Sequence, residues 1–253
     1  MVLVALEVRH PPAEPMTAAA VSRAKKILGG VTPLQEPQTI SGFMISTAGP
    51  TQQPMETAQR FSSRDRSTAV TFRSGAVVVE TTRYRQYEDL REVIGLALRA
   101  REAAGPVDGV LRVGLRYIDE IRTPAEDGPL GWSEWVDPSL LGPAPLATVH
   151  GLQVSQWQGL VMFTGSNDAQ LLLRYGPGEG YAVDPGGELR RPAPAPGPFF
   201  LLDIDNFWSP EPVPDFTVAA LLQRCDDLHK PVLGLFESLI TEKLRKEVLR
   251  RVG

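Results

Sequence analysis

Two aspartates, Asp203 and Asp205, follow an apolar run in the stretch FFLLDIDNFW, residues 199–208. Carboxylates at this spacing can hold a divalent cation if further oxygen ligands approach, such as a third carboxylate or a substrate phosphate. They can also be the solvated face of a strand. The apolar run before them and Asn206 after them favour a buried strand that turns polar as it ends. The sequence therefore predicts no metal here, and the alternative is a metal-dependent phosphate-handling enzyme built on Asp203 and Asp205.

Arginines form the second group of candidate residues, because only five of the 26 basic residues are lysines. Eight arginines fall on expected strands between residues 59 and 121: Arg60, Arg64, Arg66, Arg73, Arg83, Arg85, Arg112 and Arg116. Guanidinium groups that share one sheet face can bind an anion or an acidic partner. Nearby acidic residues such as Asp65, Glu80 and Glu120 are also available for cross-strand pairs, which would leave a mixed-charge surface instead.

The stretch GVLRVGLRYIDEI, residues 109–121, has the clearest strand pattern in the chain. Its alternation places Arg112 and Arg116 on one polar face, about 13 Å apart by strand rise. That span suits an extended acidic partner, or two anionic groups of one ligand. We predict that Arg112 and Arg116 belong to a recognition surface, together with Arg83 and Arg64.

Other residue types that carry catalysis give no convincing arrangement in the sequence. The three histidines, His10, His150 and His229, are isolated, and no pair has a metal-binding spacing. Cys225 lies on the apolar side of an expected helix and has acidic neighbours, which disfavour a reactive thiolate. The stretch GPGEG at 176–180 lacks the following Lys-Ser/Thr of a phosphate loop and predicts a hairpin turn. The sequence thus predicts no catalytic residue, no metal ligand and no cofactor.

Composition limits the class of protein further. The chain has 253 residues and a net charge of −4, which argues against a nucleic-acid partner. Its apolar runs are far shorter than the roughly 20 residues that cross a bilayer, so no membrane partner is expected. The first residues, MVLVALEVRH, lack the basic region of a signal peptide and predict a strand. A single cysteine excludes internal disulfides, and a cytoplasmic location is expected.

The pattern of elements predicts an α+β fold, with antiparallel sheets covered by helices. In the first half we expect a helix near 16–28, a hairpin at Ser74-Gly75 and a strand over 109–121. In the second half we expect strands near 147–157, 159–165, 169–175 and 199–208. A long helical segment over 216–250 closes the chain, with a kink or break at Pro231.

The same pattern predicts two docked halves that form one compact unit. Residues 1–123 form the N-terminal half, and residues 147–253 form the C-terminal sheet with its long helix. Residues 124–146 are rich in proline and glycine and are expected to connect the halves.

Five phrases carry a resemblance to a known family. In chain order they are RFSSRDRSTAVTF, VVVETTRYRQYEDLREVI, VLRVGLRYIDEI, LLDIDNFW and LHKPVLGLFESLITEKLR, which span most of residues 60–246. They resemble a sporadically distributed, uncharacterised family of bacterial and archaeal proteins of about this length. The resemblance implies folding as one unit and transfers no activity. The function we expect is a non-catalytic, cytoplasmic binding module for a protein partner or an anionic small molecule.

Overall fold

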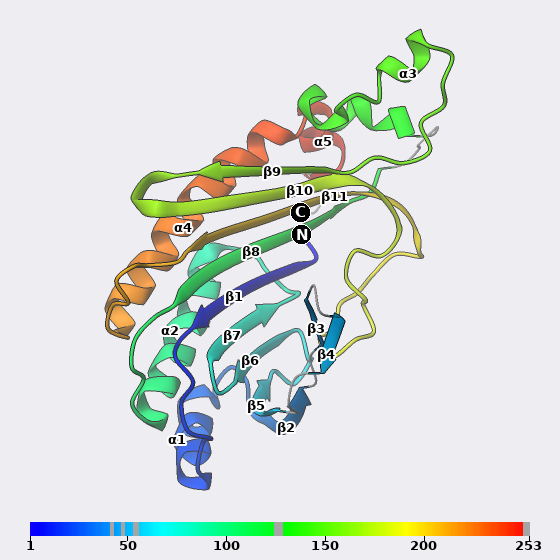
Figure 1. Ribbon diagram of the computed structural model, residues 1–253. Helices are drawn as coiled ribbons and strands as arrows, with labels where there is room; N and C mark the ends of the chain where they lie inside the picture. The colour runs from blue at the N-terminus through cyan, green and yellow to red at the C-terminus, as the bar shows by residue number, and fades with distance from the viewer. Residues whose placement is uncertain (41–42, 47–48, 53–55, 124–128, 250–253) are drawn as a thin grey trace.

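A nine-stranded antiparallel sheet forms the centre of the computed structural model, which describes residues 1–40, 43–46, 49–52, 56–123 and 129–249 (Figure 1). Its strand order is β2-β5-β6-β7-β1-β8-β11-β10-β9. The strands are β1 (Leu3–Arg9), β2 (Leu34–Ile40), β5 (Glu56–Ser62), β6 (Thr68–Phe72), β7 (Ala76–Thr81), β8 (Arg112–Ile121), β9 (Gly159–Thr164), β10 (Ala169–Gly180) and β11 (Gly197–Trp208). A separate hairpin pairs β3 (Phe43–Ser46) with β4 (Gly49–Gln52).

Three helices cover one face of the sheet: α1 (Ala18–Leu28), α2 (Tyr87–Ala104) and α4 (Val218–Leu239) (Figure 1). The α1 helix packs on α2, α2 packs on β7 and α4, and α4 packs on β8 and β11. Shorter elements are α3 (Leu146–Val149), α5 (Glu242–Glu247) and the 3₁₀ turns η1 (Pro129–Glu134), η2 (Pro138–Leu141) and η3 (Ser166–Asp168). In the part of the chain that the structure describes, no helix covers the opposite face, which we call the open face.

Alternation along the central strands separates the apolar core from the open face. In β8, Leu115 and Tyr117 are buried on the helix-covered side, whereas Arg116 points to the open face. In the neighbouring β11, Leu202 and Ile204 are fully buried on the helix-covered side. Because successive residues of a strand face opposite ways, the charged residues of both strands meet on the open face.

The predicted α+β class with antiparallel sheet and helices is confirmed. The hairpin at Ser74-Gly75 joins β6 to β7, as expected. The closing segment consists of α4 and α5, which Ile240 and Thr241 separate, rather than one run over 216–250. Pro231 lies inside α4 on its exposed side, and a kink there is not confirmed.

Two local predictions are wrong. The strand expected over 147–157 is absent from these described residues, where the chain forms the end of α3 and then irregular structure. The stretch at 176–180 is not a hairpin turn, because it continues β10 and pairs with residues 197–201 of β11. Gly176 and Gly178 tolerate close approach there, since a Cβ on either would lie within 3 Å of a neighbouring chain segment.

Both predicted halves contribute to the same sheet, because β8 of the first pairs along its length with β11 of the second. Residues 124–128 of the predicted connection lie outside the described residues. The remainder of the connection places Trp132, Trp135 and Leu140 in the core. None of the described helices is both long enough and apolar enough to cross a membrane.

Candidate functional site

The Asp203 carboxylate is held by two arginines in the middle of the sheet, on the open face. It accepts hydrogen bonds from Nε and Nη2 of Arg116, both at 2.7 Å, and from Nη1 of Arg174 at 3.2 Å. Its side chain is 4% exposed, whereas that of Arg116 is 44% exposed. The strand expected over 199–208 is confirmed as β11, but it does not become solvated at Asp203, which is 2% exposed. Arginines from the flanking strands β8 and β10 make the burial of a carboxylate tolerable.

Asp205 lies beside this group and is paired with Arg112, whose Nη2 donates to it at 3.0 and 3.3 Å. Arg112 also donates to Glu7 at 3.2 Å and stacks over the ring of Phe207 at 4.6 Å. Gly114 leaves the space for this guanidinium, since a Cβ there would lie 2.2 Å from Arg112 Nη1. Burial raises the pKa of the Asp205 carboxyl above its ordinary value, against the opposing effect of Arg112.

These pairs leave Asp203 and Asp205 with cationic partners rather than with open oxygens. Among the described residues, no group of three His, Cys, Asp or Glu side chains is placed to hold a metal ion. Asp119 of β8 lies on the helix-covered side of the sheet, away from Arg116, and cannot serve as a third carboxylate beside Asp203 and Asp205. The arrangement is a charge network built into the sheet.

Other predicted arginines lie in turns instead of on strands. Arg64 is exposed in the turn between β5 and β6, and Arg83 follows the end of β7. Of the eight arginines expected on strands, the structure places three there: Arg60, Arg112 and Arg116. The prediction failed because the stretch SSRDRS forms its own hydrogen-bonded turn, which interrupts the strand after Ser62.

Asp65 organises this turn. Its Oδ1 accepts hydrogen bonds from the hydroxyls of Ser63 at 2.6 Å and Ser67 at 2.8 Å, and from the Ser67 amide at 3.1 Å. Its Oδ2 accepts one from Arg83 at 3.2 Å. The Ser63 hydroxyl, with the Ser67 amide, holds the pKa of Asp65 well below its ordinary value. Arg66 follows in the left-handed region at φ 57°, which a non-glycine residue rarely adopts.

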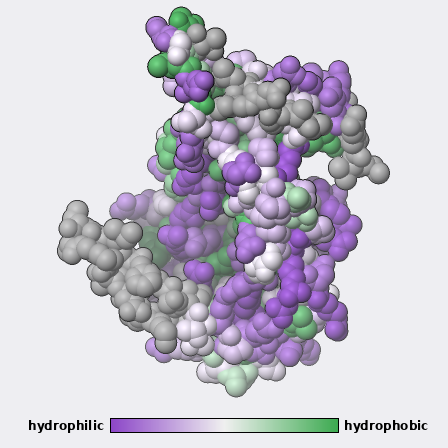
Figure 2. Space-filling model, turned by 90° about the vertical axis from the view of Figure 1, so that its right-hand side faces the viewer, coloured by the Kyte–Doolittle hydropathy of each residue, from purple (hydrophilic) through white to green (hydrophobic). Residues whose placement is uncertain are grey.

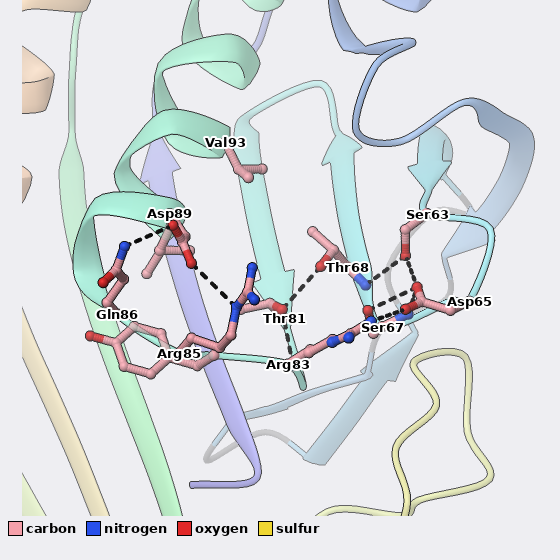
Figure 3. A pocket seen from close by; sticks show the side chains of 12 residues that line it. Ser63, Asp65, Ser67, Thr68, Thr81, Arg83, Arg85, Gln86, Asp89 and Val93 are labelled. Atoms are coloured by element: carbon pink, nitrogen blue, oxygen red, sulfur yellow. Dashed lines mark hydrogen bonds and ion pairs between the residues drawn. The ribbon is translucent and has the colours of Figure 1, made fainter. Parts of the chain in front are cut away.

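A cavity of about 300 Å³ lies between this turn and the start of α2 (Figure 3). Figure 3 shows Arg83 and Arg85 reaching into this region from the segment that joins β7 to α2. Hydroxyl groups of Ser63, Ser67 and Thr81 line it, and Arg85 pairs with Asp89 at 3.5 Å. Both arginine pairs are open to solvent, and the Arg83 side chain is 70% exposed.

A second cavity of about 520 Å³ shares Asp65, Ser67 and Arg83 with the first. Its other wall comes from the loop between β10 and β11, which supplies Arg190 and Arg191. We call the two adjoining cavities the Arg83 site. Hydrophilic residues predominate on the side of the molecule that Figure 2 shows, where this loop runs.

Backbone contacts hold the loop against the β5–β6 turn. The Arg190 amide donates to the carbonyl of Arg66 at 2.9 Å, and the Thr82 hydroxyl donates to the carbonyl of Arg190 at 2.7 Å. Arg191 is buried, and its Nη2 donates to Glu120 and to the Val183 carbonyl, both at 3.0 Å. Its buried Nε has no hydrogen-bond partner among the described residues. A buried N–H donor without a partner is costly.

Beneath the site, a hydrogen bond links the core strand β8 to α4. The Tyr117 hydroxyl lies 2.8 Å from Nδ1 of His229, and the His229 ring stacks on Tyr87 at 3.9 Å between centroids. His229 is therefore held by two tyrosines, through a hydrogen bond to Tyr117 and ring stacking on Tyr87. Cys225 is fully buried, as expected, and burial raises the pKa of its thiol to about 12.

The structure brings together only part of the predicted site. Arg83 faces the cavities and Arg64 lies in the adjacent turn, but Arg112 and Arg116 line neither cavity. Sequence reasoning missed Arg190 and Arg191, because they lie in a Pro- and Gly-rich excursion without periodicity. Their adjacency in the stretch LRRP was the one available signal.

A scan against protein-family models gave no match to this chain, and a search of curated protein sequences gave none either.

Proposed function

We propose that this protein is a non-catalytic binding module for an anionic small molecule, and that the Arg83 site takes its phosphate or carboxylate group. The supporting observation is the gathering of Arg83, Arg85, Arg190 and Arg191 around two adjoining cavities. Among the described residues, only two acidic side chains, Asp65 and Asp89, line the cavities with them. Arginine suits this role because its planar fork of donors matches two oxygens of a carboxylate or phosphate.

The existing ion pairs do not prevent such a ligand from binding. Exposed pairs such as Arg83–Asp65 and Arg85–Asp89 contribute roughly 0–1 kcal/mol, so a ligand oxygen can replace either carboxylate at small cost. The hydroxyls of Thr68 and Thr81 lie on the same wall and share one hydrogen bond at 3.0 Å, so the hydroxyl that accepts it keeps its own hydrogen for a ligand. Arg191 lines the second cavity but is bonded to the buried Glu120 carboxylate, so Arg83, Arg85 and Arg190 are the arginines available to a ligand.

The alternative, a metal-dependent phosphate-handling enzyme built on Asp203 and Asp205, has less support. Both carboxylates already accept hydrogen bonds from arginines, at 2.7 Å to Arg116 and 3.0 Å to Arg112. A divalent cation would have to displace these partners and would then lie beside their positive charges. A ligand at the Arg83 site displaces only half-exposed carboxylates, which costs less.

Pyrophosphate, citrate and inorganic phosphate are suitable probes, and isothermal titration calorimetry with each one tests the proposal. Arg83→Gln removes the charge that both cavities share. We expect it to weaken binding of the best probe about tenfold or more, since one hydrogen bond to a charged group is worth roughly 1.5–3 kcal/mol. Arg190→Gln should weaken binding similarly, and the melting temperature should change little in either variant.

Arg73→Gln is the matched control, because it removes the same charge from an exposed arginine in the β6–β7 hairpin, outside both cavities. We expect its affinity for the probe to equal that of the unmodified chain. If no probe binds, or if Arg73→Gln weakens binding as much as Arg83→Gln does, the proposal fails. A cytoplasmic location and the family resemblance stay predictions, and both are compatible with such a module.

A further inference from the structure

We propose that the edge strand β9 is a self-association surface, through which two copies of this chain pair their β9 strands and continue one sheet across both. The β9 strand, Gly159–Thr164, stands at one end of the strand order and pairs with β10 alone among the described strands. Its other backbone edge therefore carries donors and acceptors that a further strand can satisfy.

Apolar side chains of β9 are exposed on both faces of the sheet. Leu160 and Met162, which share a face with Arg174 and Leu172 of β10, are 65% and 50% exposed. Phe163 is 42% exposed on the other face, where it borders a cavity of about 680 Å³ beside α4. Large apolar side chains exposed together in this way mark an interaction site.

The opposite edge of the sheet shows how this fold protects a strand that must stay unpaired. The β2 strand, LQEPQTI, contains Glu36 and Pro37. A proline lacks the amide that a new strand would use, and a charge opposes apolar association. By contrast, no Asp, Glu, Lys or Arg occurs between His150 and Asp168, a stretch that includes all of β9.

These features indicate that the partner bound at the β9 edge is a β-strand. A small molecule or a helix in the cavity beside α4 would cover Phe163 but would leave Leu160, Met162 and the backbone edge exposed. Only a strand that extends the sheet meets the backbone edge and both faces together. A single association then pairs the backbone donors and acceptors of the β9 edge and buries its apolar side chains.

A second copy of β9 fits this edge without conflict. A twofold axis perpendicular to the sheet keeps every side chain on its own face. Antiparallel pairing about Met162 then sets Met162 opposite its symmetry mate, Leu160 opposite Thr164 and Val161 opposite Phe163. Every such pair is uncharged, so no like charges meet across the interface.

Analytical ultracentrifugation of the full chain at about 1–100 µM tests the proposal. We expect the unmodified chain to sediment as a dimer. Met162→Lys should sediment as a monomer, because it places two like charges directly opposite each other. Leu160→Lys is a second variant at another exposed position, and it should also weaken the dimer.

Leu111→Lys is the matched control, since it adds the same charge at an exposed apolar residue just before β8, and it should remain a dimer. Hydrogen exchange should show the β9 amides that do not bond to β10 protected in the unmodified chain and exposed in Met162→Lys, with a native circular dichroism spectrum in both. The proposal is overturned if the unmodified chain is a monomer throughout, as it would be if another protein or a ligand occupied this edge. A dimer that persists in a folded Met162→Lys variant overturns it as well.

Discussion

Two sets of arginines, Arg112 with Arg116 and Arg83 with Arg85, have different environments in this molecule. On the open face, Arg112 and Arg116 bond to carboxylates that neighbouring strands bury. At the Arg83 site, Arg83 and Arg85 pair with half-exposed carboxylates from turns and a helix end. The first set is committed to holding the sheet together, whereas the second keeps donors that a ligand can use. Burial of the acidic partner, more than the arginine itself, separates the structural role of the first set from the binding role that we propose for the second.

Of the variants that test this comparison, Arg116→Met should lower the free energy of unfolding most. It leaves the 4%-exposed Asp203 carboxylate with Arg174 as its remaining charged partner. Removing one member of a buried pair costs roughly 3–5 kcal/mol, and we expect about 2 kcal/mol because Arg174 stays and Arg116 is 44% exposed. Denaturant unfolding measures the loss. Arg83→Met, the partner variant, should stay within about 0.5 kcal/mol of the unmodified chain.

The same pair of variants also tests the earlier expectation that Arg116 belongs to the recognition surface. If that expectation holds, Arg116→Met keeps its stability and loses affinity for the anionic probe. We expect the reverse, with affinity retained and stability lost.

The pH dependence of stability tests the same comparison through two acidic partners, Asp205 and Asp65. Its expected effect on the free energy of unfolding is smaller than that of Arg116→Met. Burial raises the Asp205 pKa, so as the pH falls the folded state binds a proton there at a higher pH than the unfolded state does. Its contribution to stability is therefore present below the ordinary pKa of about 3.9 and declines as pH rises through the raised value. Asp205→Asn should remove this decline, so the variant gains stability relative to the unmodified chain between about pH 4 and pH 7.

Asp65 should show the opposite sign. Its pKa is lowered by the Ser63 and Ser67 hydrogen bonds, so its contribution is present above the ordinary pKa and is lost as pH falls below it. Asp65→Asn should then be less stable than the unmodified chain at neutral pH and should approach it in acid. Thermal melts of both variants from about pH 3 to pH 7 measure the two trends. Parallel trends in the two variants would contradict the assignment.

Double-mutant cycles give the smallest expected effect. The coupling energy between Arg83 and Asp65 should be within about 0.5 kcal/mol, because both side chains are largely solvated. The coupling between Arg116 and Asp203 should exceed about 1 kcal/mol, since the carboxylate is buried and the contact is bidentate. Equal couplings would mean that burial does not distinguish the two sets.

The sequence predicted those elements that depend on local pattern. Alternation identified β8 and the shared face of Arg112 and Arg116, and the helical segments expected near 16–28 and over 216–250 correspond to α1 and to α4 with α5. It failed where a distant strand decides the outcome. Asp203 and Asp205 looked like the end of a strand, because the arginines that neutralise them come from β8 and β10. The local sequence does not indicate which strands are neighbours in the sheet.

The candidate site was predicted only in part, for a related reason. Arg83 was selected for its charge, but it was expected on a strand beside Arg112. The Asp65-centred turn ends β5 instead, and it places Arg83 opposite Arg190 and Arg191, more than a hundred residues later. The spacing of residues in the sequence does not predict the contacts of a loop that has no periodic pattern.

The position of β1 has a consequence for biosynthesis. This strand is synthesised before the other described strands of the sheet, yet it lies between β7 and β8 in the middle of the sheet. At translation rates of about 5–20 residues per second, the roughly 110 residues that follow β1 take roughly 5–20 s to appear. Throughout that time the apolar stretch of β1 has no partner on its β8 side. The nascent chain therefore offers chaperones an early and long-lived binding segment, and a pause in translation before residue 121 would prolong it.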